Sequence, residues 1–180
     1  MKSLSTILFL QLTSSLVGAQ DLDSKVKAIE NKCAEIRSHL NTNDTKKIDI
    51  KNESTEGGQA TAYYNKGELQ LIEVEWFGET GRKSIDYYFN GVTLIFASKK
   101  EFTYNRPIYW DKKKAKEMDD NEIHDPKKTR MEENSYYFEE KKLLRWLNNN
   151  KKSVPLDLEV TEYAQGLIEH ADELRGILVR

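Results

Sequence analysis

The sequence predicts an α+β fold in which an antiparallel β-meander of hairpin repeats packs with an N-terminal and a C-terminal helix. Three observations predict it. Apolar residues recur at helical spacing near both ends of the chain, in residues 21–41 and 157–179. Between them, apolar and polar residues alternate as in strands, over 46–99 and again over 135–147. Aromatic pairs, short turns and leucines recur within this alternating region.

The first 19 residues have the pattern of a secretory signal peptide. Lys2 gives a positive start, residues 7–12 are mostly apolar, and Val17 and Ala19 form the small-x-small pattern of a cleavage site. The apolar stretch is far shorter than the ~20 residues that a membrane span needs. A buried N-terminal helix or a membrane anchor is the alternative. The sequence therefore predicts an exported protein, periplasmic or secreted.

The rest of the chain, residues 20–180, has the size of one α+β domain. The net charge of the full chain is −2, and removal of Lys2 with the signal peptide would make it −3. Charges of both signs are abundant, which argues against a nucleic acid as partner. No other apolar run is long enough to span a membrane. The single cysteine, Cys33, lies in a helical apolar pattern and is expected to be a small buried residue rather than a reactive thiol.

The first predicted helix spans residues 21–41. Its apolar residues are three or four positions apart on one narrow face: Leu22, Val26, Ile29, Cys33, Ile36 and Leu40. Such a face predicts packing along a sheet or a second helix. The same heptad-like spacing would also suit a coiled-coil partner, so a structural oligomer joined through this helix is one alternative.

A meander of at least four antiparallel strands is predicted next, beginning with an edge strand at 46–53. Turn signals separate the strands, and they are Thr55 to Gly58, Asn65-Lys66-Gly67, Gly78 to Gly81 and Asn90-Gly91. The alternation slips at Leu71-Ile72, which predicts a β-bulge there.

A polar insertion is predicted at about 111–133, before the strand pattern resumes at 135–147. Its residues 112–116 are basic and 117–122 are mostly acidic, and Pro107 excludes a central strand in the segment just before it. A stretch this charged is expected to be a loop or helix fragment that is either solvated or functional. The last predicted helix, 157–179, carries a wide apolar stripe.

Three units of the predicted sheet share one pattern, in which an aromatic pair and a leucine are separated by four residues. The units are Tyr63-Tyr64-x4-Leu69, Tyr88-Phe89-x4-Leu94 and Tyr137-Phe138-x4-Leu143. Their offsets of 25 and 49 residues indicate repeated hairpins. Since one hairpin cannot bury its own apolar face, neighbouring hairpins are expected to stack and share it.

These repeats carry a resemblance. The segments Gly57–Leu69 and Tyr87–Phe96 resemble uncharacterised exported bacterial proteins, and the aromatic–Asn-Gly–Leu units are distantly similar to MORN-type hairpin repeats. MORN sheets are associated with protein or lipid contact, so the resemblance implies a binding role. The strict glycine-rich MORN consensus is missing here, and the resemblance therefore assigns no site residue.

The sequence contains no motif for nucleophilic catalysis or phosphate binding: it has neither a Gly-x-Ser-x-Gly motif nor a P-loop. His39 and His170 lie in predicted helices and are expected to have surface or helix-end roles. His124, with Asp125 and the acids at 119–120, could form a metal site, although such a cluster is commonly a solvated loop.

A small hydrolase is a further alternative. Glu73 and Glu75 share one strand face and, with His124, could supply acid–base chemistry if a cleft closed over them. A solvated strand face is the other interpretation of this pair. No cofactor and no metal site is predicted.

The aromatic residues are the better candidates for recognition. Trp76, at a strand end, and Tyr104, Tyr109 and Trp110, in the irregular segment after the meander, are predicted to contact a ligand or partner, because Tyr and Trp supply much of the energy of binding sites. They would be equally ordinary as core residues. The sequence thus favours an exported non-enzymatic protein, either a binding protein or an envelope-associated one. Its unknown ligand would be a protein, an envelope component or a small molecule, bound through an open sheet face and the loop at 100–133.

Overall fold

The computed structural model describes residues 7–51 and 54–179, and the side chains from Gln20 onward within these ranges. The elements in chain order are α1 (Ile7–Ser38), the 3-10 turn η1 (Leu40–Thr42), β1 (Asp44–Ile50), β2 (Gly58–Asn65), β3 (Glu68–Gly78), β4 (Gly81–Asn90), β5 (Thr93–Thr103), α2 (Lys112–Glu117), the 3-10 turn η2 (Pro126–Lys128), β6 (Arg130–Glu139), β7 (Lys142–Leu147) and α3 (Leu158–Leu178).

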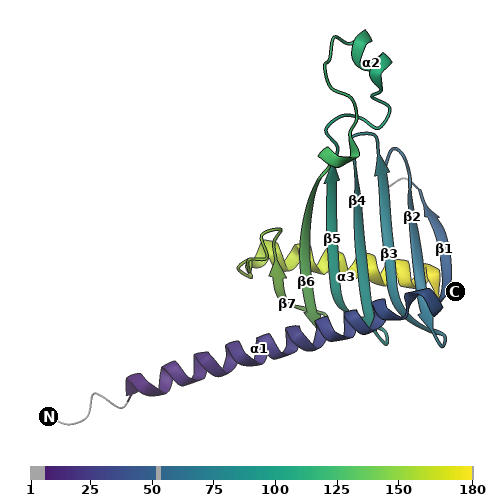
Figure 1. Ribbon diagram of the computed structural model, residues 1–180. Coiled ribbons are helices and arrows are strands. Elements are labelled where there is room, and N and C mark those ends of the chain that lie inside the picture. Colours follow the sequence, from purple (N-terminus) through teal and green to yellow (C-terminus); the bar gives the residue numbers. More distant parts are fainter. Residues whose placement is uncertain (1–6, 52–53, 180) are drawn as a thin grey trace.

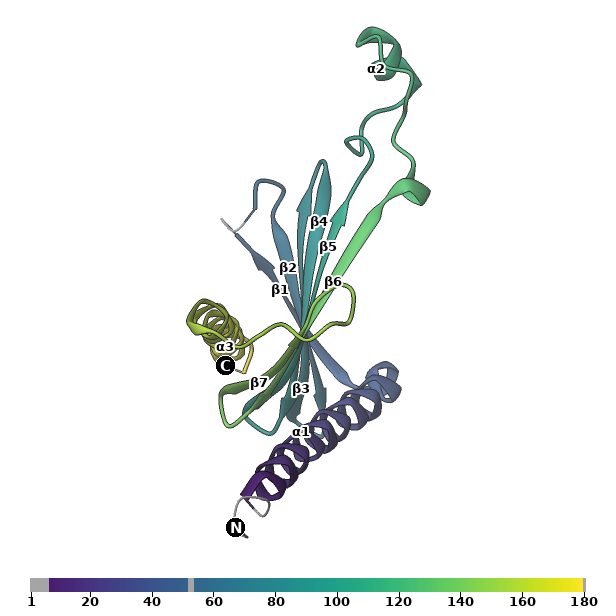
Figure 2. The same cartoon turned by 90° about the vertical axis from the view of Figure 1, so that its left-hand side faces the viewer.

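One antiparallel sheet forms the centre of the molecule. Its seven strands lie side by side in chain order, β1 to β7, with no crossover (Figure 1). An N-terminal and a C-terminal helix accompany it, so the predicted α+β meander is confirmed. Figure 2 shows that α1 and α3 lie on opposite sides of the sheet, which gives three layers. We call the two sides of the sheet the α1 face and the α3 face.

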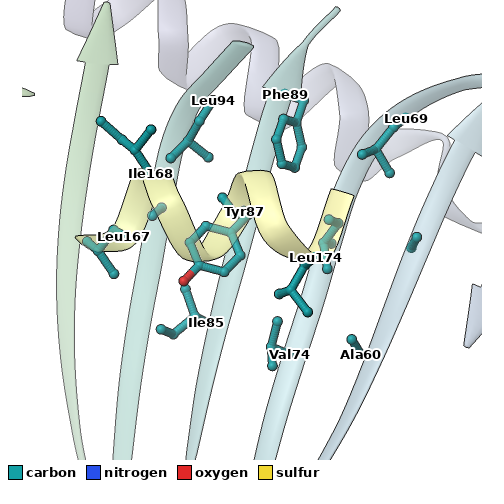
Figure 3. Close-up of a cluster of buried hydrophobic side chains, with 14 of the residues drawn as sticks. Ala60, Leu69, Val74, Ile85, Tyr87, Phe89, Leu94, Leu167, Ile168 and Leu174 are labelled. Carbon is teal, nitrogen blue, oxygen red and sulfur yellow. The ribbon is translucent and has the colours of Figure 1, made fainter. Parts of the chain in front are cut away.

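The main core lies between the sheet and α3 (Figure 3). Alternate strand residues such as Val74, Ile85 and Tyr87 point to this face because successive side chains of a strand alternate between its sides. They meet the apolar stripe of α3, which begins after the N-cap Asp157, whose carboxylate accepts a hydrogen bond from the backbone N–H of Val160 at 2.9 Å. The buried α3 residues are Val160, Ala164, Leu167, Ile168, Ala171, Leu174 and Leu178.

A smaller core lies under α1. Ile36 packs with the sheet residues Leu71 and Tyr88, and Cys33 lies beside them. The seam predicted from the sequence therefore contacts the protein's own sheet. Arg37 fixes the end of the helix, because its guanidinium lies 2.6 Å from the carboxylate of Asp86 on β4.

The three repeat units are three hairpins of the same construction, all turning at one end of the sheet (Figure 1). In each, the second aromatic residue pairs directly with the leucine: Tyr64 with Leu69, Phe89 with Leu94 and Phe138 with Leu143. In each, the register then shifts by one residue, which places a bulge at Gln70, Ile95 and Leu144. The first bulge thus lies just before the Leu71-Ile72 position that the sequence indicated.

The turns themselves differ. Lys66-Gly67 and Glu140-Lys141 have positive φ at both central residues, as two-residue hairpins of the primed type require. In the middle hairpin, Asn90 pairs with Thr93, so the turn residues are Gly91 and Val92 rather than Asn90-Gly91.

At the opposite end, the strands extend beyond both helices (Figure 1). The segment 104–129, which we call the arm, projects from this end between β5 and β6, with α2 at its tip. Part of the expected polar insertion is strand: residues 130–133 begin β6, where Glu133 pairs with Lys100 of β5. Among the described residues, no helix is long and apolar enough to cross a membrane.

Candidate binding groove

A groove lies on the α3 face at the arm end of the sheet, where α3 no longer covers the strands. Backbone pairing arranges its floor in three successive rows across β3, β4 and β5. The rows are Ile85–Lys99, beside the fully buried Val74, then Trp76–Lys83–Glu101, then Gly78–Gly81–Thr103. The first row thus ends in a lysine on β5, the second is aromatic and charged, and the third consists of glycine and threonine.

The groove has a volume of about 710 Å³, within the ~300–1,000 Å³ range of small-molecule sites. Tyr163 of α3 and Ser54 of the β1–β2 turn are among its lining residues, so it takes side chains from three parts of the chain. We call it the Trp76 groove. Its glycine row is structural, because a Cβ on Gly81 would overlap the carbonyl oxygen of Phe102 on β5.

The aromatic residue on the floor is held by α3. Trp76 stacks on His170 of α3, with ring centroids 5.7 Å apart. His170 is fixed in turn by the buried Tyr87, whose hydroxyl lies 2.8 Å from the His170 Nδ1. The indole is therefore packed on its inner side, and it still lines the groove.

A charged cluster crosses the groove beside Trp76. The Lys99 ammonium lies 2.9 Å from Glu101 and 3.1 Å from the Tyr163 hydroxyl. Burial alone would lower the pKa of Lys99, but these hydrogen bonds outweigh it and the pKa is raised. The hydrogen bond from Lys99 lowers the pKa of Glu101. Both groups are therefore charged at neutral pH.

Tyr163 belongs to a second aromatic cluster. Its ring stacks on Trp146 of β7 with centroids 5.9 Å apart, and it also contacts Tyr136 at 5.8 Å. The Trp146 indole N–H donates to Asn134 at 3.0 Å. Tyr163 is 39% exposed, so it presents part of its ring to the groove while the cluster holds the rest.

The four aromatic residues predicted to bind do not form one site. Trp76 lines the groove, whereas Tyr104, Tyr109 and Trp110 lie in the arm. Tyr104 is closest to the groove, because its backbone N–H donates to Thr80, a lining residue, at 2.9 Å. Its ring packs edge-on against His124.

Trp110 and Tyr109 have different surroundings within the arm. The Trp110 indole N–H donates to Asp120 at 3.1 Å, and Asp120 also pairs with Arg106 at 2.6 Å. Trp110 is thus part of the arm's internal framework. Tyr109 is 51% exposed and lies beside a shallow surface depression.

The three residues considered for a hydrolase, Glu73, Glu75 and His124, each interact with a different partner. Glu75 pairs with Arg82 at 2.7 Å and Glu73 accepts a hydrogen bond from Tyr63 at 2.7 Å, both on the α1 face. The His124 Nδ1 donates to the carbonyl oxygen of Arg106 at 3.0 Å, in the arm. No common cleft brings these groups together within the described part of the chain.

No described residues form a group of three or more His, Cys, Asp or Glu side chains able to hold a metal ion. Cys33 is half-buried, and burial raises the pKa of its thiol to about 12.

Comparisons with protein-family models, with curated proteins and with solved structures found no match to this chain. The resemblance to exported hairpin-repeat proteins and to MORN-type repeats therefore stays a prediction.

Sequence reasoning missed Lys83, Lys99 and Tyr163 as groove residues. A signal for the first was present: Lys83 is in phase with Ile85, Tyr87 and Phe89, which point to the core. A lysine in phase with core residues marks the point where the covered face of a strand becomes open. Tyr163 carried no comparable signal, because it reaches the groove only through the placement of α3.

Proposed function

We propose that this chain is an exported binding protein that holds a small ligand in the Trp76 groove. The observation that carries the proposal is the groove itself. It is a hollow of ligand-binding size with an aromatic and aliphatic floor, Trp76 and Ile85, and a few polar groups beside them. Known small-molecule sites combine apolar walls with a few well-placed polar groups in the same way.

Support for export comes from the pattern of residues 1–19 and from the position of α1. The first six residues of that pattern lie outside the described residues. The described side-chain contacts that tie α1 to the sheet run from Asp23, which pairs with Arg145, to Arg37, which pairs with Asp86. The first half of α1 extends past the edge strand β7 (Figure 1). Cleavage after Ala19 would therefore leave these contacts in place.

Tryptophan indole signals in a ¹H–¹⁵N NMR spectrum test the ligand site directly. The chain has three tryptophans, and Trp110 is the internal control because it lies in the arm, where its indole N–H is bonded to Asp120. The protein is titrated with a library of small aromatic and aliphatic compounds. At least one compound should shift the indole signal of Trp76 and leave that of Trp110 unchanged. Trp110→Phe and Trp146→Phe variants assign the three signals. If no compound moves the Trp76 signal, or if Trp110 moves instead, the groove is not the site.

Export is tested separately by cell fractionation and N-terminal analysis. The protein should leave the cytoplasm and begin at Gln20, in cyclised form if pyroglutamate has formed. Retention of the intact N-terminus in the cytoplasm would contradict export and leave the groove to be judged by its own test.

A further inference from the structure

The charges that line the Trp76 groove do not balance. Lys83 and Lys99 line it, and Glu101 is the one carboxylate among the described residues that do so. Arg82 also lines the groove, but its guanidinium is engaged with Glu75 of the opposite face at 2.7 Å. The groove therefore has one more cation than anion.

The carboxylate is shared unequally between the two lysines. The Glu101 carboxylate lies 2.9 Å from the Lys99 ammonium and 4.0 Å from that of Lys83. Lys99 also bonds Tyr163 and its side chain is 23% exposed, whereas that of Lys83 is 60% exposed. Lys83 thus keeps most of its hydrogen-bonding capacity for another anion.

Lys83 lies next to the aromatic residue of the groove floor. It pairs directly with Trp76 across β3 and β4, and directly opposed residues have Cβ atoms roughly 4.5–5.5 Å apart. One ligand can therefore contact the indole and the ammonium at once. A neutral ligand seated there would cover the lysine without pairing it, which costs free energy.

We propose that the ligand is a small organic anion with an aromatic or aliphatic body. Its body lies against Trp76 and Ile85, and its carboxylate, sulfonate or phosphate group faces Lys83. This inference rests on the proposed function, since it specifies the ligand of the same groove.

Two related fluorescent probes separate the anion from the body. N-phenyl-1-naphthylamine is neutral, and 8-anilino-1-naphthalenesulfonate has the same ring system with a sulfonate. Both are titrated into the purified protein, and dissociation constants are compared in low and high salt. The sulfonated probe should bind about tenfold more tightly at low salt, with the difference reduced by added salt, because screening weakens charge pairing.

Substitutions of Lys83 and Glu101, which pair across β4 and β5, should change the affinity for the sulfonated probe in opposite directions. Lys83→Gln should weaken the sulfonated probe about fivefold and leave the neutral probe unchanged, and Glu101→Gln should strengthen the sulfonated probe by removing the competing carboxylate. Lys83 is exposed, so its replacement does not disturb the core. Tyr109→Ala, in the arm, is the matched control and should change neither probe.

The outcomes separate this inference from the proposed function. If the wild type bound both probes with equal affinity and Trp76→Leu abolished binding of both, the ligand would not need to be an anion. The groove would still be the binding site. Sulfonate binding insensitive to Lys83→Gln would likewise overturn the anionic ligand. If binding of both probes survives Trp76→Leu in a variant that unfolds cooperatively, or if neither probe binds at all, the groove proposal fails as well.

Discussion

Arg37 anchors the C-terminal end of α1 to the sheet, and its replacement by methionine should destabilise the protein measurably. Its guanidinium lies 2.6 Å from Asp86 and 3.8 Å from Glu73, and 5.4 Å from the centre of the Tyr88 ring. The Asp86 side chain is 9% exposed, so this carboxylate depends on its partners. Methionine keeps much of the apolar stem over Tyr88 and removes the charge.

The expected size of the effect follows from the surroundings of Asp86. Removing one partner of a fully buried ion pair costs about 3–5 kcal/mol. Here the Arg37 side chain is 46% exposed, and Lys100 remains 3.3 Å from the carboxylate. We therefore expect Arg37→Met to lower the free energy of unfolding by about 1–2 kcal/mol.

Urea unfolding followed by circular dichroism measures this loss, and a double-mutant cycle isolates the pair. Combined with Asp86→Asn, the two changes should show a coupling of about 1 kcal/mol. Lys27→Met is the control, because Lys27 pairs with Glu30 at 3.7 Å on the exposed side of the same helix and should cost at most about 0.5 kcal/mol. An Arg37→Met loss no larger than that of Lys27→Met would refute the anchoring role.

Three further predictions concern an N-cap, a pair of glycines and the cysteine. Asp157→Ala removes the N-cap of α3 and should cost about 1 kcal/mol in thermal unfolding; an unchanged midpoint would contradict the cap. Gly81→Ala should lower the free energy of unfolding by about 2–3 kcal/mol, because the added Cβ would overlap the Phe102 carbonyl oxygen. Gly176→Ala, with open space around it, should raise it by about 0.5–1 kcal/mol. If both substitutions changed the free energy of unfolding in urea by the same amount, the overlap at Gly81 would be refuted. Cys33 should react with Ellman's reagent at pH 8 only after unfolding, because burial raises its pKa to about 12; rapid reaction of the folded protein would contradict this.

Local patterns predicted the elements well. The alternation of side chains, the turn residues and the spacing of the aromatic–leucine units are short-range signals, and they correspond to hairpins and one shared bulge position in the structure. The narrow seam of residues 21–41 predicted packing along a sheet or a second helix, and α1 does pack on the sheet; the wide stripe of α3 contributes to the larger core.

The site was less predictable because it depends on distant contacts. Trp76 was identified as a strand-end aromatic, but the groove exists because α3 returns Tyr163 to the sheet beside Lys99. Apart from Lys83, which is in phase with the core residues of β4, nothing local in the sequence gives the point along the strands where α3 stops covering them. For the same reason, the sequence did not distinguish Trp76 from Trp110. A local pattern is the same for an indole that lines a groove and for one that is hydrogen-bonded within a loop.

The order of strands in the sheet also allows it to assemble in chain order. Since every strand pairs with its neighbours in the chain, the sheet can grow from N-terminus to C-terminus by adding one strand at a time, with each loop closed over a short span except at the arm. In the chain, α3 follows all seven strands, and it covers the largest apolar surface of the sheet. A chain interrupted before residue 158 would thus hold a paired sheet with one apolar face exposed. Packing of α3 is therefore the step that buries the surface through which a partly folded chain would aggregate.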